Sequence, residues 1–87
     1  MFVNNLRSLN ELKPGETATV KENNSFGSIR RRLMDIGLVG NAMVECVGKS
    51  PLGDPSAYLI MGAVIAIRAD DSADILVETA GDESGHD

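Results

Sequence analysis

Side chains that bind metals or carry out catalysis are scarce in this chain of 87 residues, which has one cysteine and one histidine. Cys46 has no second cysteine with which to form an internal disulfide. His86 stands beside the C-terminus, so a His/Cys metal cluster cannot be assembled from this chain alone. The sequence also lacks a phosphate-binding Gly-Lys-Ser/Thr loop, a dinucleotide motif and a Ser/His/Asp set with an ordered histidine. We therefore expect no enzymatic activity, no cofactor and no dedicated metal site.

Aromatic rings and positive charge are scarce as well. The chain has no tryptophan, one tyrosine and two phenylalanines, and its 8 basic against 13 acidic residues give a net charge of −5. A protein that binds nucleic acid displaces counterions with a basic surface and often stacks bases on aromatic rings. Nucleic acid is therefore not an expected partner.

A long hydrophobic segment is also missing. The longest apolar stretch, Ala57 to Ile67, is interrupted by Gly62, whereas a membrane-spanning helix needs about 20 apolar residues. The N-terminus has no basic flank followed by an apolar core, as a secretory signal would have. The composition predicts a soluble cytoplasmic protein in which the lone Cys46, on an apolar strand, is a buried structural thiol.

The length allows one hydrophobic core and therefore one domain. We expect that domain to comprise residues 1–78. Residues 79–87 contain three acids and nothing to bury, which predicts a disordered acidic tail. A metal site made by His86 with Asp82 and Glu83 would require ordering of this tail, so we interpret His86 as incidental.

One helix is predicted after the first full strand. Asn23, Asn24 and Ser25 supply a helix N-cap. Apolar side chains then recur at the spacing of one helical face: they are Phe26, Ile29, Leu33 and Ile36. Gly37 fits the left-handed position that ends a helix, with Leu38 supplying the accompanying apolar contact.

The rest of the chain indicates short strands joined by turns. Strands are expected at 17–21, 42–49, 57–61, 63–68 and 75–78, with a loop at 50–56 that contains two prolines. Gly62 predicts a bulge or tight bend, and Asp70 to Asp74 a single helical turn capped by its acids. The fold class is therefore all-β, a small barrel with one short helix between the early strands, in which closure of the sheet hides its edges.

Three motifs, in order, resemble those of the FeoA family, the small accessory proteins of bacterial ferrous iron uptake. They are Arg-Arg-Leu-Met-Asp-Ile-Gly-Leu at 31–38, Pro-Leu-Gly-Asp-Pro at 51–55, and Ile-Ala-Ile-Arg at 65–68 followed by Ile-Leu-Val at 75–77. The resemblance runs from about Leu9 to Glu78. It departs from the family at Val39, where a proline usually precedes the second glycine.

The resemblance implies an SH3-like barrel and a partner, the FeoB-type ferrous iron transporter with its cytoplasmic GTPase region. The protein would then be cytoplasmic and peripheral to the inner membrane through that partner. The same type of domain occurs in iron-dependent repressors, which gives the alternative of a free-standing iron-linked regulator. Weak self-association is left open.

Two segments are candidates for the partner-binding surface. In the loop, Leu52 is either an exposed apolar anchor or folds back on the barrel, while the prolines lower the cost of ordering. On the helix, the arginines either dock on acidic groups or form a solvated face in which Arg31 pairs with Asp35. The candidate residues are Arg30, Arg31, Arg32, Leu38, Pro51, Leu52, Gly53, Asp54 and Pro55.

Overall fold

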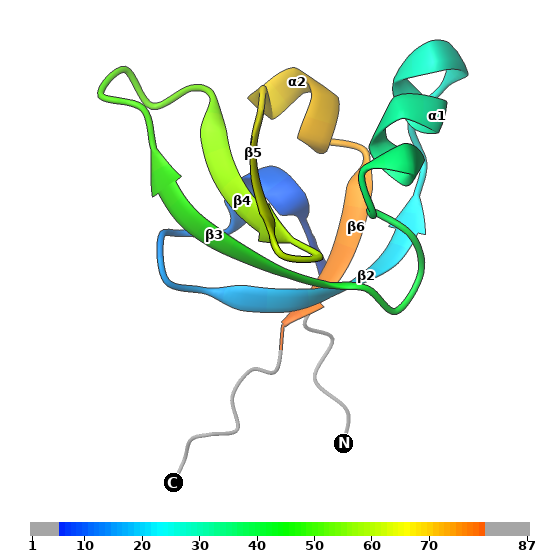
Figure 1. Ribbon diagram of the computed structural model, residues 1–87, viewed down its shortest axis with the longest axis horizontal. Coiled ribbons are helices and arrows are strands. Elements are labelled where there is room, and N and C mark those ends of the chain that lie inside the picture. The colour runs from blue at the N-terminus through cyan, green and yellow to red at the C-terminus, as the bar shows by residue number, and fades with distance from the viewer. Residues whose placement is uncertain (1–5, 80–87) are drawn as a thin grey trace, which may run out of the picture.

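The computed structural model describes residues 6–79, which form six strands and short helices (Figure 1). No helix among these residues is long and apolar enough to cross a membrane. The strands are β1 (Leu6–Ser8), β2 (Thr17–Asn23), β3 (Met43–Lys49), β4 (Ser56–Ile60), β5 (Ala63–Ile67) and β6 (Ile75–Thr79). The helices are a 3-10 turn η1 (Leu9–Glu11), α1 (Gly27–Asp35) and α2 (Ala69–Ser72).

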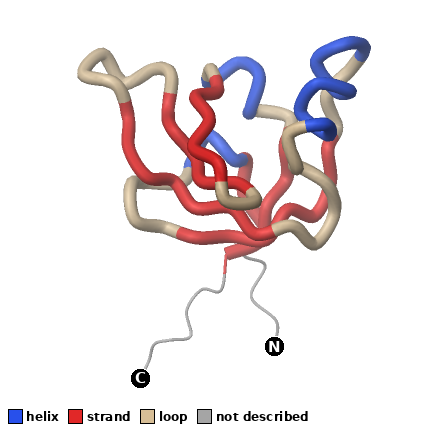
Figure 2. Tube along the Cα trace, in the orientation of Figure 1, coloured by secondary structure: helices blue, strands red, loops and turns tan. Residues whose placement is uncertain are grey.

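All six strands belong to one antiparallel sheet, so the all-β prediction is confirmed. Their order is β1-β6-β2-β3-β4-β5, and the sheet curls round its core while α1, α2 and the loop between β3 and β4 gather at one end (Figure 2). Within residues 6–79, β5 pairs with β4 alone. The expectation that closure of the sheet hides its edges is therefore wrong, because β1 and β5 are the two ends of the order of described strands and do not pair with each other.

The core is built from alternate residues of the strands. On β3, Val44 and Cys46 are buried whereas Met43 and Val47 are exposed, as the period of two predicts. Tyr58 on β4 is the largest fully buried side chain, and its hydroxyl donates to the carbonyl of Leu9 at 3.4 Å. The remaining buried apolar residues include Leu12, Ala18, Val20, Leu33, Ile60, Ile67, Ile75 and Val77.

The C-terminus of α1 ends as predicted. Gly37 has φ 111°, the amide of Gly37 donates to the carbonyl of Met34, and the amide of Leu38 donates to the carbonyl of Leu33, both at 3.0 Å. This pair of bonds satisfies carbonyls that a helix end leaves free. A Cβ atom on Gly37 would lie 2.9 Å from Ile60 Cγ2 and 2.7 Å from Met61 Sδ. Glycine is therefore required here both for its backbone angle and for space.

The N-terminus of α1 differs from the prediction. Phe26 has extended backbone angles and lies before the first helical residue, with 81% of its surface exposed. It therefore falls outside the helical periodicity, and its assignment to the buried face is wrong. The expected cap residues instead form a local turn in which Asn23 Oδ1 accepts from both the amide and the hydroxyl of Ser25.

The hairpin between β4 and β5 turns on two residues. Met61 and Gly62 have φ of 51° and 85°, and Ile60 pairs with Ala63 across the turn. Two successive positive φ values characterise the tight turn whose twist matches that of antiparallel strands. The glycine signal therefore marks a hairpin turn and not a bulge.

Candidate partner-binding surface

The loop between β3 and β4 is held by its own hydrogen bonds. The amide of Gly53 donates to the carbonyl of Ser50 at 2.8 Å, and the amide of Ser50 donates to the carbonyl of Pro55 at 3.0 Å. The Ser50 hydroxyl also donates to the carbonyl of Asp54 at 2.8 Å. A loop closed in this way loses little conformational freedom when it binds.

Asp54 joins this loop to α2. The backbone amide of Ala69, the first residue of α2, donates to Asp54 Oδ1 at 2.8 Å. Arg68, which stands at the capping position, supplies no side-chain hydrogen bond to the helix. A residue 15 positions earlier therefore satisfies an amide that the start of a helix leaves free. Asp70 and Asp71 lie in the first turn of α2, where negative charge is favourable.

Leu52 projects from the tip of the loop. Its surface is 93% exposed, which excludes the alternative in which it folds back on the barrel. Pro51, Gly53 and Asp54 beside it are exposed too, whereas Pro55 is half-buried. A large apolar side chain held in water on a rigid loop is a suitable anchor for a protein partner.

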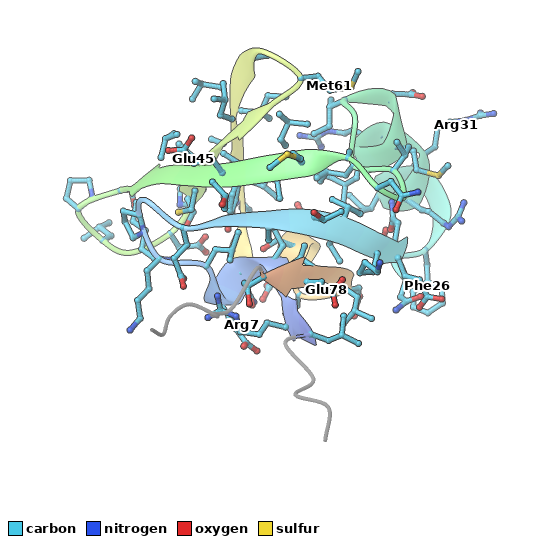
Figure 3. The ribbon with its side chains drawn as sticks, turned by 90° about the horizontal axis from the view of Figure 1, so that it is seen from below. Arg7, Phe26, Arg31, Glu45, Met61 and Glu78 are labelled. Carbon is cyan, nitrogen blue, oxygen red and sulfur yellow. The ribbon has the colours of Figure 1, made fainter. Side chains whose placement is uncertain are left out.

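The arginines of α1 are exposed but do not form one patch. Arg31 points away from the body of the protein (Figure 3). Within residues 6–79, neither Arg31 nor Asp35 forms an ion pair, so the predicted pair between them is absent. Arg30 lies against the same helix, with Nη1 3.2 Å from Met34 Sδ. Arg32 faces the opposite way, toward β5.

A groove of about 400 Å³ is lined by one residue of each candidate segment, Arg32 and Pro55. It lies between α1 and β5, with Arg32 in one wall and Pro55 in the other. Its apolar lining comes from Ile29, Leu33, Ile36, Ile65 and Ile67, and its charged lining from Arg32, Arg68 and Asp71. The isoleucines of β5, Arg68 and Asp71 were missed from sequence, because only the pairing of β5 with β4 places them opposite α1.

Leu38 does not belong to this surface. Its side chain is 0% exposed and packs in the core. The residue that follows the left-handed glycine turns back over the helix to contact its last buried residue. The inclusion of Leu38 among partner-binding residues is therefore corrected.

Side chains that could bind a metal ion do not cluster in the described part of the chain. Within residues 6–79, no three His, Cys, Asp or Glu side chains lie close enough together to hold a metal ion, and Cys46 is a free, buried thiol. The residues His86, Asp82 and Glu83 lie outside the described part.

The carboxylate of Glu16 accepts a hydrogen bond from the Lys13 amide and pairs with Arg7, and these interactions lower the pKa of Glu16.

The sequence matches that of a known protein family and of a curated relative. The family model described as the FeoA domain matches residues 7–79 of this chain. A fusion protein of Fe(2+) transport protein A and Fe(2+) transporter FeoB from Porphyromonas gingivalis is 34% identical over 70 residues, or 80% of this chain. The chain spans only 8% of the length of that curated relative.

Solved structures share the fold. The FeoA protein from Chlorobium tepidum, at 35% identity, superposes with a TM-score of 0.82 over 91% of this chain and 75% of its own. FeoA of Stenotrophomonas maltophilia, solved with zinc and described as an SH3 domain protein, matches at 27% identity and a TM-score of 0.74 over 82% of this chain and 88% of its own. The predicted SH3-like fold is confirmed.

Structures described as a manganese-dependent transcriptional repressor and as IdeR also match. The T. acidophilum protein described as IdeR superposes with a TM-score of 0.76 at 20% identity, over 91% of this chain and 36% of its own. Identity at this level shows a common fold and no more.

Proposed function

Since the chain belongs to the FeoA family, we propose that it is an accessory protein of ferrous iron transport that docks on a FeoB-type transporter. The single observation that carries this is the fusion protein, in which a relative of this chain and such a transporter share one polypeptide. Two domains that are fused in one polypeptide are held at a high effective concentration relative to each other. The protein would then be cytoplasmic and held at the membrane by its partner.

The docking surface that we propose combines an apolar anchor on the loop between β3 and β4 with charged groups on α1, on the other side of the groove (Figure 1). Leu52 stands on a loop fixed by internal hydrogen bonds, and exposed arginines lie on α1. Interfaces typically bury an apolar centre and surround it with polar groups. Arg30 and Arg31 would act mainly on the association rate, because exposed charges steer encounter more than they add affinity.

Docking changes transport only if the two proteins bind differently in different transporter states. A ligand with equal affinity for two conformations shifts neither. The accessory role therefore requires that the affinity of this chain depend on whether the transporter is open or closed, or on its bound nucleotide.

Binding to the purified transporter in nanodiscs tests this proposal. Leu52→Asp should weaken binding at least tenfold, because it places a charge where apolar surface is buried. Met43→Asp, at another exposed apolar side chain, is the matched control and should bind like the wild type. Repetition with and without guanine nucleotide measures the dependence on state.

Two results would contradict the proposal. If the wild-type chain does not bind the transporter in any nucleotide state, docking is wrong. If Leu52→Asp and the double variant Arg30→Glu/Arg31→Glu both stay folded and bind like the wild type, this surface is wrong. Circular dichroism of each variant is the folding control.

A further inference from the structure

The outer edge of β5 has hydrogen-bonding groups with no strand beside them. Ile60 and Ala63 close a two-residue turn, so they form a hydrogen-bonded pair, and such pairs alternate along an antiparallel ladder. Ala63, Ile65 and Ile67 therefore direct their backbone groups toward β4. Val64 and Ala66 direct their N–H and C=O groups to the free side, where β5 pairs with no described strand.

This edge also lacks the usual protection against strand addition. Proteins protect edge strands with charges, prolines or bulges, or keep them very short. The opposite edge, β1, has three residues and carries Arg7. By contrast, β5 reads Ala-Val-Ile-Ala-Ile, without a charge or a proline and with regular pairing throughout.

The groove beside this edge has the lining that an added strand would need. Side chains on one face of that strand would enter between Ile65 of β5 and Ile29 and Ile36 of α1. Arg32 and Arg68 stand at the same groove, and neither forms an ion pair with a carboxylate of residues 6–79. Asp71 is the one acid in the lining, so the groove favours an occupant with negative charge.

We propose that the β5 edge and the groove against α1 form a site for β-strand addition, occupied by an extended segment of the partner in which apolar and acidic residues alternate. This inference rests on the proposed function for the identity of the partner. Main-chain bonds to Val64 and Ala66 supply affinity, and the groove reads alternate side chains. A second copy of this chain fits less well, because its own β5 carries no acidic residue to pair with Arg32 and Arg68.

A synthetic probe tests the site without the transporter. The probe is an acetylated and amidated hexapeptide of alternating valine and glutamate, and binding to the full chain is followed by amide NMR shifts. We expect shifts at Val64 and Ala66, and slower hydrogen exchange of both amides. The same peptide N-methylated at alternate amides should bind about tenfold more weakly, because it lacks donors for the ladder.

Variants separate the backbone contribution from the charge contribution. Val64→Pro removes an outward N–H that β4 does not use, which an edge strand tolerates. It should weaken the peptide about tenfold. Arg32→Glu/Arg68→Glu should weaken the acidic peptide and strengthen a lysine counterpart, whereas Lys13→Glu, in the turn before β2, should change neither. Thermal melts confirm that each variant is folded.

Several outcomes would overturn the site. Equal binding of the N-methylated and unmodified peptides, or equal binding by folded Val64→Pro, excludes strand addition. A dimer in sedimentation that Val64→Pro converts to monomer assigns the edge to self-association instead. If the wild type binds the transporter and Val64→Pro binds it equally well, this inference is overturned while the proposed function stands. If the peptide binds but the transporter does not, the strand-addition site stands and the proposed function is wrong.

Discussion

Gly37 combines a positive φ with a lack of space for a Cβ atom, whereas the other described glycines with positive φ have open space. Its φ of 111° is strained for any other residue, and a Cβ atom would overlap Ile60 and Met61. Gly53 has φ 88° but open space around its Cα. It therefore experiences the backbone strain without the overlap, which makes it a matched control.

We predict that Gly37→Ala lowers the free energy of unfolding by about 2–5 kcal/mol, the combined effect of strain and overpacking. Gly53→Ala should lower it by about 1–2 kcal/mol, from strain alone. Gly37→Val should destabilise at least as much as Gly37→Ala. Urea unfolding of the three variants measures these differences, and equal losses at the two glycines would show that the packing against Ile60 yields freely.

Tyr58 makes stability depend on alkaline pH. Burial raises its pKa above the ordinary value of 10.0, because the phenolate loses more hydration than the phenol. Between the unfolded and folded pKa values, the folded state holds a proton that the unfolded state has released. The contribution is therefore complete below about pH 10 and is lost as the pH rises further.

We predict that the urea midpoint of the wild type falls between pH 9 and pH 11 more steeply than that of Tyr58→Phe. The variant also loses the hydrogen bond to Leu9, so its stability at pH 8 should be lower by about 1 kcal/mol. Parallel curves for the two proteins would mean that another group, such as an exposed lysine, accounts for the alkaline loss.

At the scale of elements, the loop at 50–55 and α2 act together through Asp54. We predict that Asp54→Ala costs about 0.5–2 kcal/mol, as the loss of a helix cap does, and increases hydrogen exchange at the Ala69 amide. Asp54→Asn keeps an acceptor oxygen and should retain most of the stability. If exchange at Ala69 does not change in Asp54→Ala, the loop and α2 are independent.

The elements that sequence predicted are those with a local signal. The end of α1 was predictable because Gly37 and Leu38 follow a helical pattern directly, and the alternation of β3 follows from its period of two. Phe26 was misplaced because the same spacing continues one residue beyond the helix start. The cap that Asp54 provides to Ala69, and the groove that Arg32 and Pro55 both line, depend on strand pairing across the sheet, so no local pattern contains them.

The candidate surface was predicted in its parts and not in its arrangement. The arginines and the proline-containing loop are visible as motifs, and the exposure of Leu52 agrees with its polar neighbours. The groove between them requires the position of β5 at the edge of the sheet. An apolar strand such as Ala63–Ile67 reads as a buried strand from sequence, and only the strand order reveals its free side.

At the scale of the whole molecule, the domain should fold and keep its stability without residues 80–87. We predict that a chain ending at Thr79 keeps the denaturation midpoint of the full chain, because the residues removed have no apolar side chains larger than alanine to lose. A chain ending at Leu76 is the contrasting control, since it removes Val77 from the core and the pairing of Glu78 with Leu6. A lower midpoint on removal of residues 80–87 alone would show that they contribute to folding.

The pairing of Leu6 with Glu78 has an architectural consequence. The first and last described strands run side by side, so the polypeptide enters and leaves this unit at neighbouring points, away from the end that carries α1 and the loop (Figure 1). Units whose ends lie close together can be spliced into larger chains with little distortion. A covalent connection at either end would then act as a tether on one side while the groove stays open on the other.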